Sequence, residues 1–230
     1  MKIFSIEPTN HCNAKCWFCP HPDKDLHNRK KGHMSLETIK RVIELTEADT
    51  ISINGLGEPL MNPLIFDIIQ LLTDAGIKTL MNSNGKMVTQ ESYDKLVKAG
   101  LTRLIITSDY FKWDKTINEV PELKLEHIVV DSEPQFEGQI KKELYDWAGR
   151  VGDAKNERTS CSYIQDDWVQ IAWNGDIVRC CQDFNSEEVF GNIFDEGVDF
   201  NFQNKAINIC KGCQGFKFKN ALVVGNYKDE

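Results

Sequence analysis

Short apolar runs alternate with longer amphipathic segments along the first 131 residues of the chain. The runs contain many β-branched residues and end at glycine or at polar turn residues, which is typical of buried strands. They lie at residues 2–8, 50–55, 77–85, 101–109 and 123–131. From the second run onward their starts recur at roughly 25 residues, the length expected of a strand–helix unit with short loops.

The segments between the runs carry apolar side chains at helical spacing and predict helices. The first covers residues 35–47, and the second follows Asn62 and Pro63, which suit an N-cap and a first helical turn. Thr89 caps a third helix, and a last one covers residues 137–147. Alternating strands and helices predict a parallel sheet with right-handed crossovers. Five or six such units are too few to close a barrel, so the expected fold is α/β, an open partial (β/α) barrel.

A different pattern follows this alternation. Residues 168–181 hold two short apolar runs around Asn174-Gly175, a dipeptide that favours a hairpin turn. The remaining residues are rich in cysteine and lack the strand–helix repeat. The sequence therefore predicts two domains, a partial barrel over residues 1–155 and a small cysteine-rich domain over residues 156–230.

The composition is that of an average globular protein, with 41% apolar and 27% charged residues. No run of about 18 apolar residues is present, so no membrane partner is expected. An acidic residue and a proline interrupt the start of the chain before a signal-peptide core could form, which predicts a cytoplasmic protein. The net charge of −8 argues against an extended nucleic-acid-binding surface, because phosphate binding needs many lysines and arginines.

Eight cysteines in a chain expected in the cytoplasm predict reduced thiols that bind a metal or a cluster. Cys12, Cys16 and Cys19 have the spacing C-x3-C-x2-C, with which a short loop can offer three thiolates to an iron–sulfur cluster. Three ligands leave one metal position open for a substrate or cofactor. The alternative is a zinc site closed by a fourth ligand, His11 or His21.

Three further polar or glycine-rich loops follow predicted strands, namely GLGEP at 55–59, NSNG at 82–85 and Ser108-Asp109. Because the carboxyl ends of parallel strands meet at one edge of a sheet, these loops are expected to converge on the cysteine loop. The sequence thus predicts a single site at that edge.

With these motifs the chain resembles the radical SAM superfamily. The resemblance implies that Cys12, Cys16 and Cys19 hold a [4Fe–4S] cluster, and that its open iron binds the amino and carboxylate groups of S-adenosylmethionine. It also implies that an electron from the cluster cleaves the sulfonium and that the resulting 5′-deoxyadenosyl radical abstracts hydrogen from a substrate.

The resemblance assigns further residues to S-adenosylmethionine. Phe18 occupies the aromatic position that lies against adenine, and the GLGEP loop is similar to the family's loop that meets the methionine amino group. The full implied set is Phe18, Gly57, Glu58, Pro59, Ser83, Asn84, Ser108 and Asp109. The chain departs from many relatives in residues 110–121, which contain lysines but no arginine for the methionine carboxylate.

The second group of cysteines resembles the SPASM and twitch extensions of the superfamily, through the G-x4-C element that ends at Cys180. The ligands that this resemblance implies for one auxiliary [4Fe–4S] cluster are Cys161, Cys180, Cys210 and Cys213. A single cluster fits a twitch domain, the form found in 2-deoxy-scyllo-inosamine dehydrogenases. Zinc is the alternative occupant. Cys181 is not expected to be a ligand, because neighbouring side chains on a strand point to opposite faces.

The expected function is that of a radical SAM oxidoreductase that passes a second electron to the auxiliary cluster. The expected partners are a small-molecule or peptide substrate and a reducing electron donor such as flavodoxin or ferredoxin. The chain begins directly with its first strand, which favours a small molecule over a peptide. The alternatives are a peptide-modifying enzyme or epimerase, and a metal-stabilised binding protein without enzymatic activity. The sequence assigns no catalytic acid or base.

Overall fold

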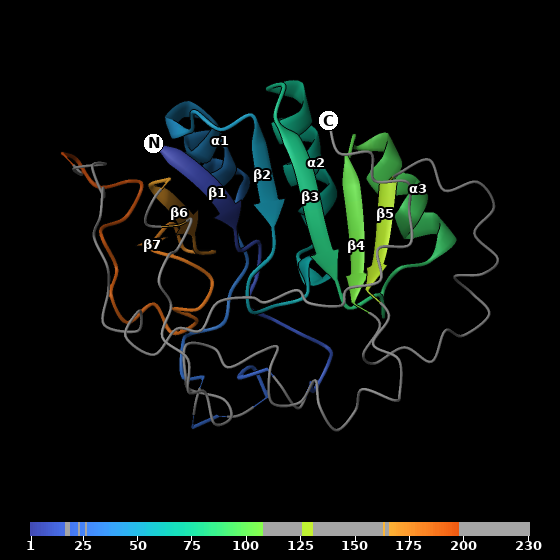
Figure 1. Cartoon of the computed structure of the whole chain (residues 1–230), viewed down its shortest axis with the longest axis horizontal. Coiled ribbons are helices and arrows are strands. Elements are labelled where there is room, and N and C mark those ends of the chain that lie inside the picture. Colours follow the sequence, from blue (N-terminus) through green and yellow to red (C-terminus); the bar gives the residue numbers. More distant parts are fainter. Residues whose placement is uncertain are drawn as a thin grey trace.

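The computed structural model describes residues 1–16, 19–22, 24–25, 27–107, 126–130, 163 and 166–197. Within these residues the central feature is a seven-stranded sheet in the order β5-β4-β3-β2-β1-β6-β7 (Figure 1). The strands are β1 (Lys2–Ile6), β2 (Thr50–Ile53), β3 (Lys78–Ser83), β4 (Arg103–Thr107), β5 (Glu126–Val130), β6 (Trp168–Ile171) and β7 (Ile177–Val178). Neighbours from β5 to β6 pair in parallel, and β7 is antiparallel to β6.

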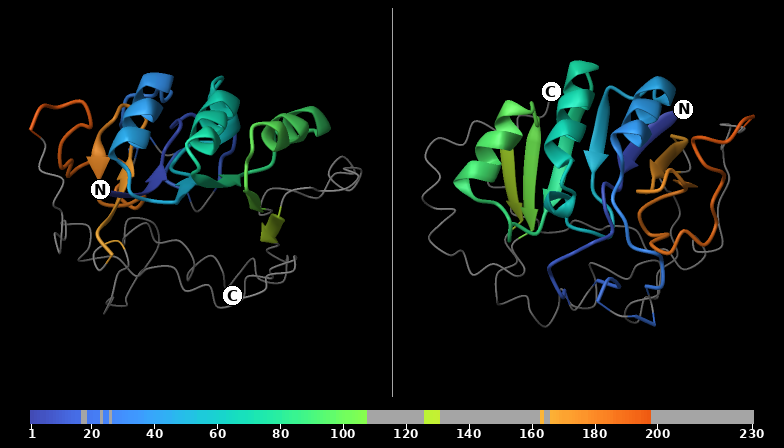
Figure 2. Two further views of the ribbon diagram at one scale, coloured as in Figure 1. Left: turned by 90° about the horizontal axis from the view of Figure 1, so that it is seen from above. Right: turned by 180° about the vertical axis from the view of Figure 1, so that it is seen from behind.

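Helices cover one face of this sheet. They are α1 (Leu36–Leu45), α2 (Ile65–Asp74) and α3 (Gln90–Lys98), and a short 3-10 turn, η1 (Pro59–Met61), precedes α2. Seen from above, all three helices lie on the same side of the strands (Figure 2). Six parallel strands with helices on their outer face form the predicted α/β partial barrel. No helix of the described residues is long and apolar enough to span a membrane.

Two of the three described helices begin with a side-chain cap, and of these the sequence predicted the cap at Thr89. The Ser35 hydroxyl accepts a hydrogen bond from the Thr38 N–H at 3.1 Å and caps α1. Thr89 caps α3 and forms a reciprocal capping box with Ser92. Each cap satisfies backbone N–H groups that the first helical turn leaves without an intrahelical acceptor.

The expected cap of α2 is wrong. The N-cap position is Leu64, which makes no side-chain cap, and Asn62 lies two residues earlier. The Asn62 side chain is fully buried, and its amide donates to the carbonyls of Pro8 at 2.8 Å and Met34 at 3.1 Å. Its own oxygen accepts from the Leu64 N–H at 2.8 Å. Asn62 therefore ties the segment before α2 to the end of β1, which local sequence pattern could not reveal.

The hydrophobic core lies between the sheet and its helices. Helix α2 contributes Ile65, Ile68, Ile69 and Leu72, and the strands contribute Ile3, Ile6, Ile51, Ile53, Met81, Leu104, Ile106, Val169 and Ile171. Burying a side chain of this size contributes about 1.5–3 kcal/mol relative to leaving it exposed. The core thus fixes the strands in register, and the strand ends in turn place the loops.

The predicted hairpin is present as β6 and β7. Gly175 has a φ of 89° in the connection, a conformation that glycine adopts without steric strain. The sequence did not predict that β6 pairs in parallel with β1, which makes the hairpin an extension of the barrel sheet. The boundary near residue 155 and the helix at 137–147 lie outside the described residues, so both stay predictions.

Candidate functional site

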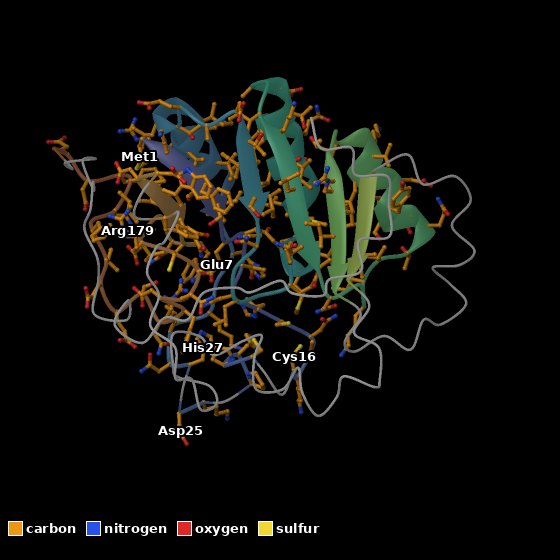
Figure 3. The ribbon with its side chains drawn as sticks, viewed as in Figure 1. Met1, Glu7, Cys16, Asp25, His27 and Arg179 are labelled. Carbon is orange, nitrogen blue, oxygen red and sulfur yellow. The ribbon has the colours of Figure 1, made fainter. Side chains whose placement is uncertain are left out.

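The cysteine loop lies beyond the carboxyl ends of the parallel strands, where the labelled Cys16 stands clear of the sheet (Figure 3). Cys12, Cys16 and Cys19 are all half-buried, and the Cys19 N–H donates to the Cys16 carbonyl at 3.1 Å. Backbone N–H groups also point at two of the sulfurs, from Ala14 to Cys12 Sγ at 3.4 Å and from His21 to Cys19 Sγ at 3.5 Å. Such donors favour the thiolate form that binds iron.

Burial opposes this effect. It raises the pKa of Cys12, and it raises the pKa of Cys19 to about 12, with Cys16 and Cys12 adding like charge. Burial therefore favours the protonated thiol at Cys12 and Cys19 in the metal-free protein. None of the five cysteines that the structure describes forms a disulfide.

Among the described residues, no group of three or more His, Cys, Asp or Glu side chains is arranged to hold a metal ion. Within this part of the chain, the zinc alternative gains no fourth ligand. The chemical type of the side chains, three thiols within eight residues of sequence, still matches that of iron–sulfur cluster ligands.

The GLGEP loop after β2 packs directly on the cysteine loop. A Cβ atom at Gly57 would lie 2.6 Å from the His11 carbonyl oxygen and closer still to that of Thr9. The next residue, Glu58, donates its N–H to the same His11 carbonyl at 2.8 Å. Gly57 is therefore required for close approach of two backbones, and this contact sets the position of the first cysteine.

Glu58 connects the loop after β2 to the loop after β3. Its carboxylate is almost fully buried and accepts hydrogen bonds from the Ser83 hydroxyl at 2.8 Å, the Asn84 N–H at 2.7 Å and the Leu60 N–H at 3.3 Å. Burial raises the pKa of Glu58, although these donors act in the opposite direction. Pro59 follows as the first residue of η1 and is buried.

Asn84 extends this network to the cysteines. Its Nδ2 donates to Asn13 Oδ1 at 2.9 Å and to Cys12 Sγ at 3.7 Å. The structure thus brings together Gly57, Glu58, Ser83 and Asn84 with the cysteine loop, as the shared strand edge predicted. The other predicted SAM residues, Phe18, Ser108 and Asp109, lie outside the described residues, as do Cys161, Cys210 and Cys213. Cys180 is described; it is buried, two residues after β7.

Sequence reasoning missed a buried ion pair beneath the site. Glu7, which directly follows β1, pairs with Arg29 at 2.8 Å, with side-chain exposures of 2% and 10%. The second Glu7 oxygen accepts from the Leu56 N–H at 3.2 Å, and Arg29 also donates to the Phe184 carbonyl at 3.1 Å. Its position could have indicated this role, because Glu7 follows the first strand at the same sheet edge where the candidate loops follow the other strands.

A neighbouring polar residue, Asn10, was missed in the same way. Its fully buried side chain donates to the Lys30 carbonyl at 2.9 Å and accepts from the Gly32 N–H at 2.9 Å. These two bonds mimic a strand pairing and hold the segment after the cysteine loop against its start. Asn10 therefore holds together the residues that precede and the residues that follow the cysteine loop.

Comparison with known proteins agrees with this geometry. The sequence profile of the radical SAM superfamily matches residues 6–122. The S-adenosyl-L-methionine-dependent 2-deoxy-scyllo-inosamine dehydrogenase of Niallia circulans is 23% identical over 210 residues, which cover 86% of this chain and 81% of that protein. The AdoMet-dependent heme synthase of Methanosarcina barkeri is 30% identical over 110 residues, or 47% of this chain and 31% of that protein. The chain thus spans most of the first relative and about a third of the second.

Among solved structures, the crystal structure of BtrN in complex with AdoMet and 2-DOIA is similar to this chain with a TM-score of 0.67. The alignment has 20% sequence identity and covers 84% of this chain and 78% of that one. This likeness shows a common fold.

Proposed function

Because the chain belongs to the radical SAM superfamily, we propose that it is an oxidoreductase that cleaves S-adenosylmethionine at a [4Fe–4S] cluster held by Cys12, Cys16 and Cys19. The bound cluster supplies one electron for this cleavage, and the radical so formed takes hydrogen from a substrate carbon. The observation that carries the proposal is the contact of three motif loops at one strand edge. The Glu58 N–H meets the His11 carbonyl at 2.8 Å, and Asn84 Nδ2 lies 3.7 Å from Cys12 Sγ.

Glu58 is the proposed contact for the methionine amino group. A carboxylate offers about four acceptor positions, and Glu58 uses two on Oε1 and one on Oε2 for partners within the described residues. The remaining position on Oε2 suits an ammonium group. Burial strengthens such a charge-assisted hydrogen bond, because little water competes for the carboxylate.

The second cysteine set is proposed to hold an auxiliary [4Fe–4S] cluster through Cys161, Cys180, Cys210 and Cys213. Net oxidation of a C–H and O–H pair requires loss of two electrons and two protons. The hydrogen abstraction removes one of each, the auxiliary cluster would accept the second electron, and the remaining O–H proton would pass to solvent. Support comes from the position of Cys180 beside a hairpin that extends the barrel sheet next to β1.

The proposed substrate is a small hydroxyl-bearing molecule that is oxidised to a carbonyl compound. The support is the dehydrogenase of Niallia circulans, whose similarity covers 86% of this chain. Peptide modification is the competing outcome. Transfer of deuterium from labelled alcohols or labelled peptides into 5′-deoxyadenosine distinguishes the two, because the abstracted atom ends in that product.

An acidic reductant such as flavodoxin or ferredoxin is the proposed electron donor. The chain carries a net charge of −8, yet exposed lysines surround the cysteine loop, including Lys15, Lys30, Lys31 and Lys86. Opposite charges speed the encounter of two proteins, and salt screens this effect. Changing Lys15 and Lys30 to Glu should slow reduction by flavodoxin and leave reduction by dithionite unchanged. If flavodoxin reduced the variant as fast as the unaltered protein, these lysines would be excluded as its docking surface.

The central test is anaerobic reconstitution with iron and sulfide. Two clusters predict about eight irons per chain, and one cluster plus zinc predicts about four. Changing Cys12, Cys16 or Cys19 to Ala should abolish 5′-deoxyadenosine formation, whereas the matched control Cys181→Ala should retain it. Unchanged 5′-deoxyadenosine formation by the Cys12→Ala protein would refute the proposed cluster site, and tightly bound zinc would refute the auxiliary cluster alone.

A further inference from the structure

Asn84 lies in a fixed orientation against the first cysteine of the loop. Its Oδ1 accepts from the Lys86 N–H at 2.9 Å, and its Nδ2 donates to Asn13 Oδ1 at 2.9 Å. If the Asn84 amide were flipped, its NH₂ group would face the Lys86 N–H and its oxygen would face Asn13 Oδ1. Neither contact would be a hydrogen bond, so the network selects one orientation. In that orientation the amide N–H group faces Cys12 Sγ at 3.7 Å.

The backbone of Asn84 is held as firmly as its side chain. Its N–H donates at 2.7 Å to Glu58, whose carboxylate is only 1% exposed and also accepts from the adjacent Ser83 hydroxyl. The Gly85 N–H donates in turn to the Ser83 hydroxyl at 3.0 Å. The turn after β3 therefore cannot rotate Asn84 away from the cysteine loop without breaking buried hydrogen bonds, each of which contributes about 0.5–1.5 kcal/mol.

A hydrogen bond to a cluster sulfur has a defined electrostatic effect. The positive end of the N–H dipole stabilises negative charge on the sulfur, and one-electron reduction adds negative charge to the cluster. The bond is consequently stronger in the reduced state than in the oxidised state. A donor at this position makes the cluster easier to reduce.

We propose that Asn84 is a positioning residue that raises the reduction potential of the cluster through its hydrogen bond to Cys12, rather than a ligand of S-adenosylmethionine. This inference rests on the proposed function, since it requires the cluster. In the reduction itself one electron passes from the reductant to the cluster, and Asn84 neither gains nor loses a proton. It replaces the role that the family resemblance assigned to this side chain.

The test is a redox titration of the reconstituted full-length protein without S-adenosylmethionine, followed by EPR. The signal of the loop cluster is identified as the one that the Cys12→Ala protein lacks. Asn84→Ala should lower the midpoint potential by an amount equivalent to an about tenfold change in the reduction equilibrium, or about 59 mV for one electron. Iron content should stay at the level of the unaltered protein.

A second pair of variants separates the hydrogen bond from charge. Asn84→Asp keeps an acceptor for the Lys86 N–H but loses the donor, whereas Asn13→Asp adds the same charge beside the loop and keeps the Asn84 donor. The potential of Asn84→Asp should fall below that of Asn13→Asp. This comparison also stands if the Ala variant loses iron.

Several outcomes would overturn the inference. An Asn84→Ala protein with an unchanged potential but weaker binding of S-adenosylmethionine would make Asn84 a ligand of that molecule. Loss of the loop iron from both Asn84 variants, with Asn13→Asp fully loaded, would make it a residue needed to hold the cluster. By contrast, failure of the unaltered protein to assemble the cluster or to form 5′-deoxyadenosine would refute the proposed function itself.

Discussion

The buried pair of Glu7 and Arg29 permits a quantitative prediction. The two side chains meet in a two-point contact, at 2.8 Å between Oε1 and Nη2 and at 3.3 Å between Oε2 and Nη1. With exposures of 2% and 10%, neither group can recover its lost hydration from bulk water. Replacing Arg29 with Met would leave a buried carboxylate with one described donor, the Leu56 N–H. Removal of one member of such a pair costs about 3–5 kcal/mol, because the remaining charge is uncompensated.

The measurement is urea denaturation of the reduced, metal-free protein followed by circular dichroism. Arg29→Met should lower the free energy of unfolding by about 3–5 kcal/mol with no change in the m-value. Adding Glu7→Gln should restore more than half of this loss, because a neutral amide has a far smaller desolvation penalty than a carboxylate. The matched control is Lys95→Met, which breaks the exposed pair with Glu91 and should leave the free energy of unfolding almost unchanged.

Two results would refute this reasoning. If Arg29→Met were no more destabilising than Lys95→Met, the pair would not be effectively buried. If the double variant of Glu7 and Arg29 were less stable than Arg29→Met, the cost would come from lost packing of the arginine side chain instead of an unpaired charge.

Three further predictions concern the same region. Gly57→Ala should destabilise the protein by about 1–3 kcal/mol and lower the iron bound on reconstitution, because the new Cβ meets the His11 carbonyl; full iron loading would contradict this. Burial lowers the pKa of His27 to about 4, so the metal-free protein should lose stability as pH falls from 6.5 towards 4, where the unfolded chain binds a proton that the native side chain does not. His27→Gln should flatten this dependence in denaturation curves, and an unchanged slope would exclude His27 as its source. Asn62→Ala should cost about 1–3 kcal/mol by leaving buried groups unsatisfied, measured by the same denaturation, and Asn62→Asp should not rescue it because two carbonyls would still lack donors.

Much of the fold could be predicted because it depends on local pattern. Strand β2 and helix α3 follow directly from a β-branched run and from the cap at Thr89, which act within a few residues. The pairing of β6 with β1 could not be predicted, because it joins residues more than 160 positions apart, and hydrophobic pattern does not specify which strands become neighbours. The prediction that Asn62 caps α2 was wrong for the same reason, since the partners of its side chain lie after β1 and before α1.

The same distinction between predictable and unpredictable features applies to the candidate site. Parallel strands place their carboxyl ends at one edge, so the convergence of the cysteine loop with GLGEP and NSNG followed from topology alone. What each side chain contacts could not be predicted, because it depends on distances of a few tenths of an ångström between loops. Glu58 was expected to face a ligand, and the structure shows that its carboxylate oxygens accept hydrogen bonds from Ser83 and Asn84.

These contacts explain how several loops together hold the cysteine loop in place. Ordering the eight-residue segment from Cys12 to Cys19 costs about 1–2 kcal/mol per residue in backbone entropy. Here the cost is offset by neighbours, because the His11 carbonyl receives the Glu58 N–H and Asn84 reaches Cys12. Each of those neighbours is itself fixed by the end of a strand. Residues that would face the cofactor are thereby also the residues that hold the loop, so substitutions at Glu58 or Asn84 should alter cluster properties even before S-adenosylmethionine binds.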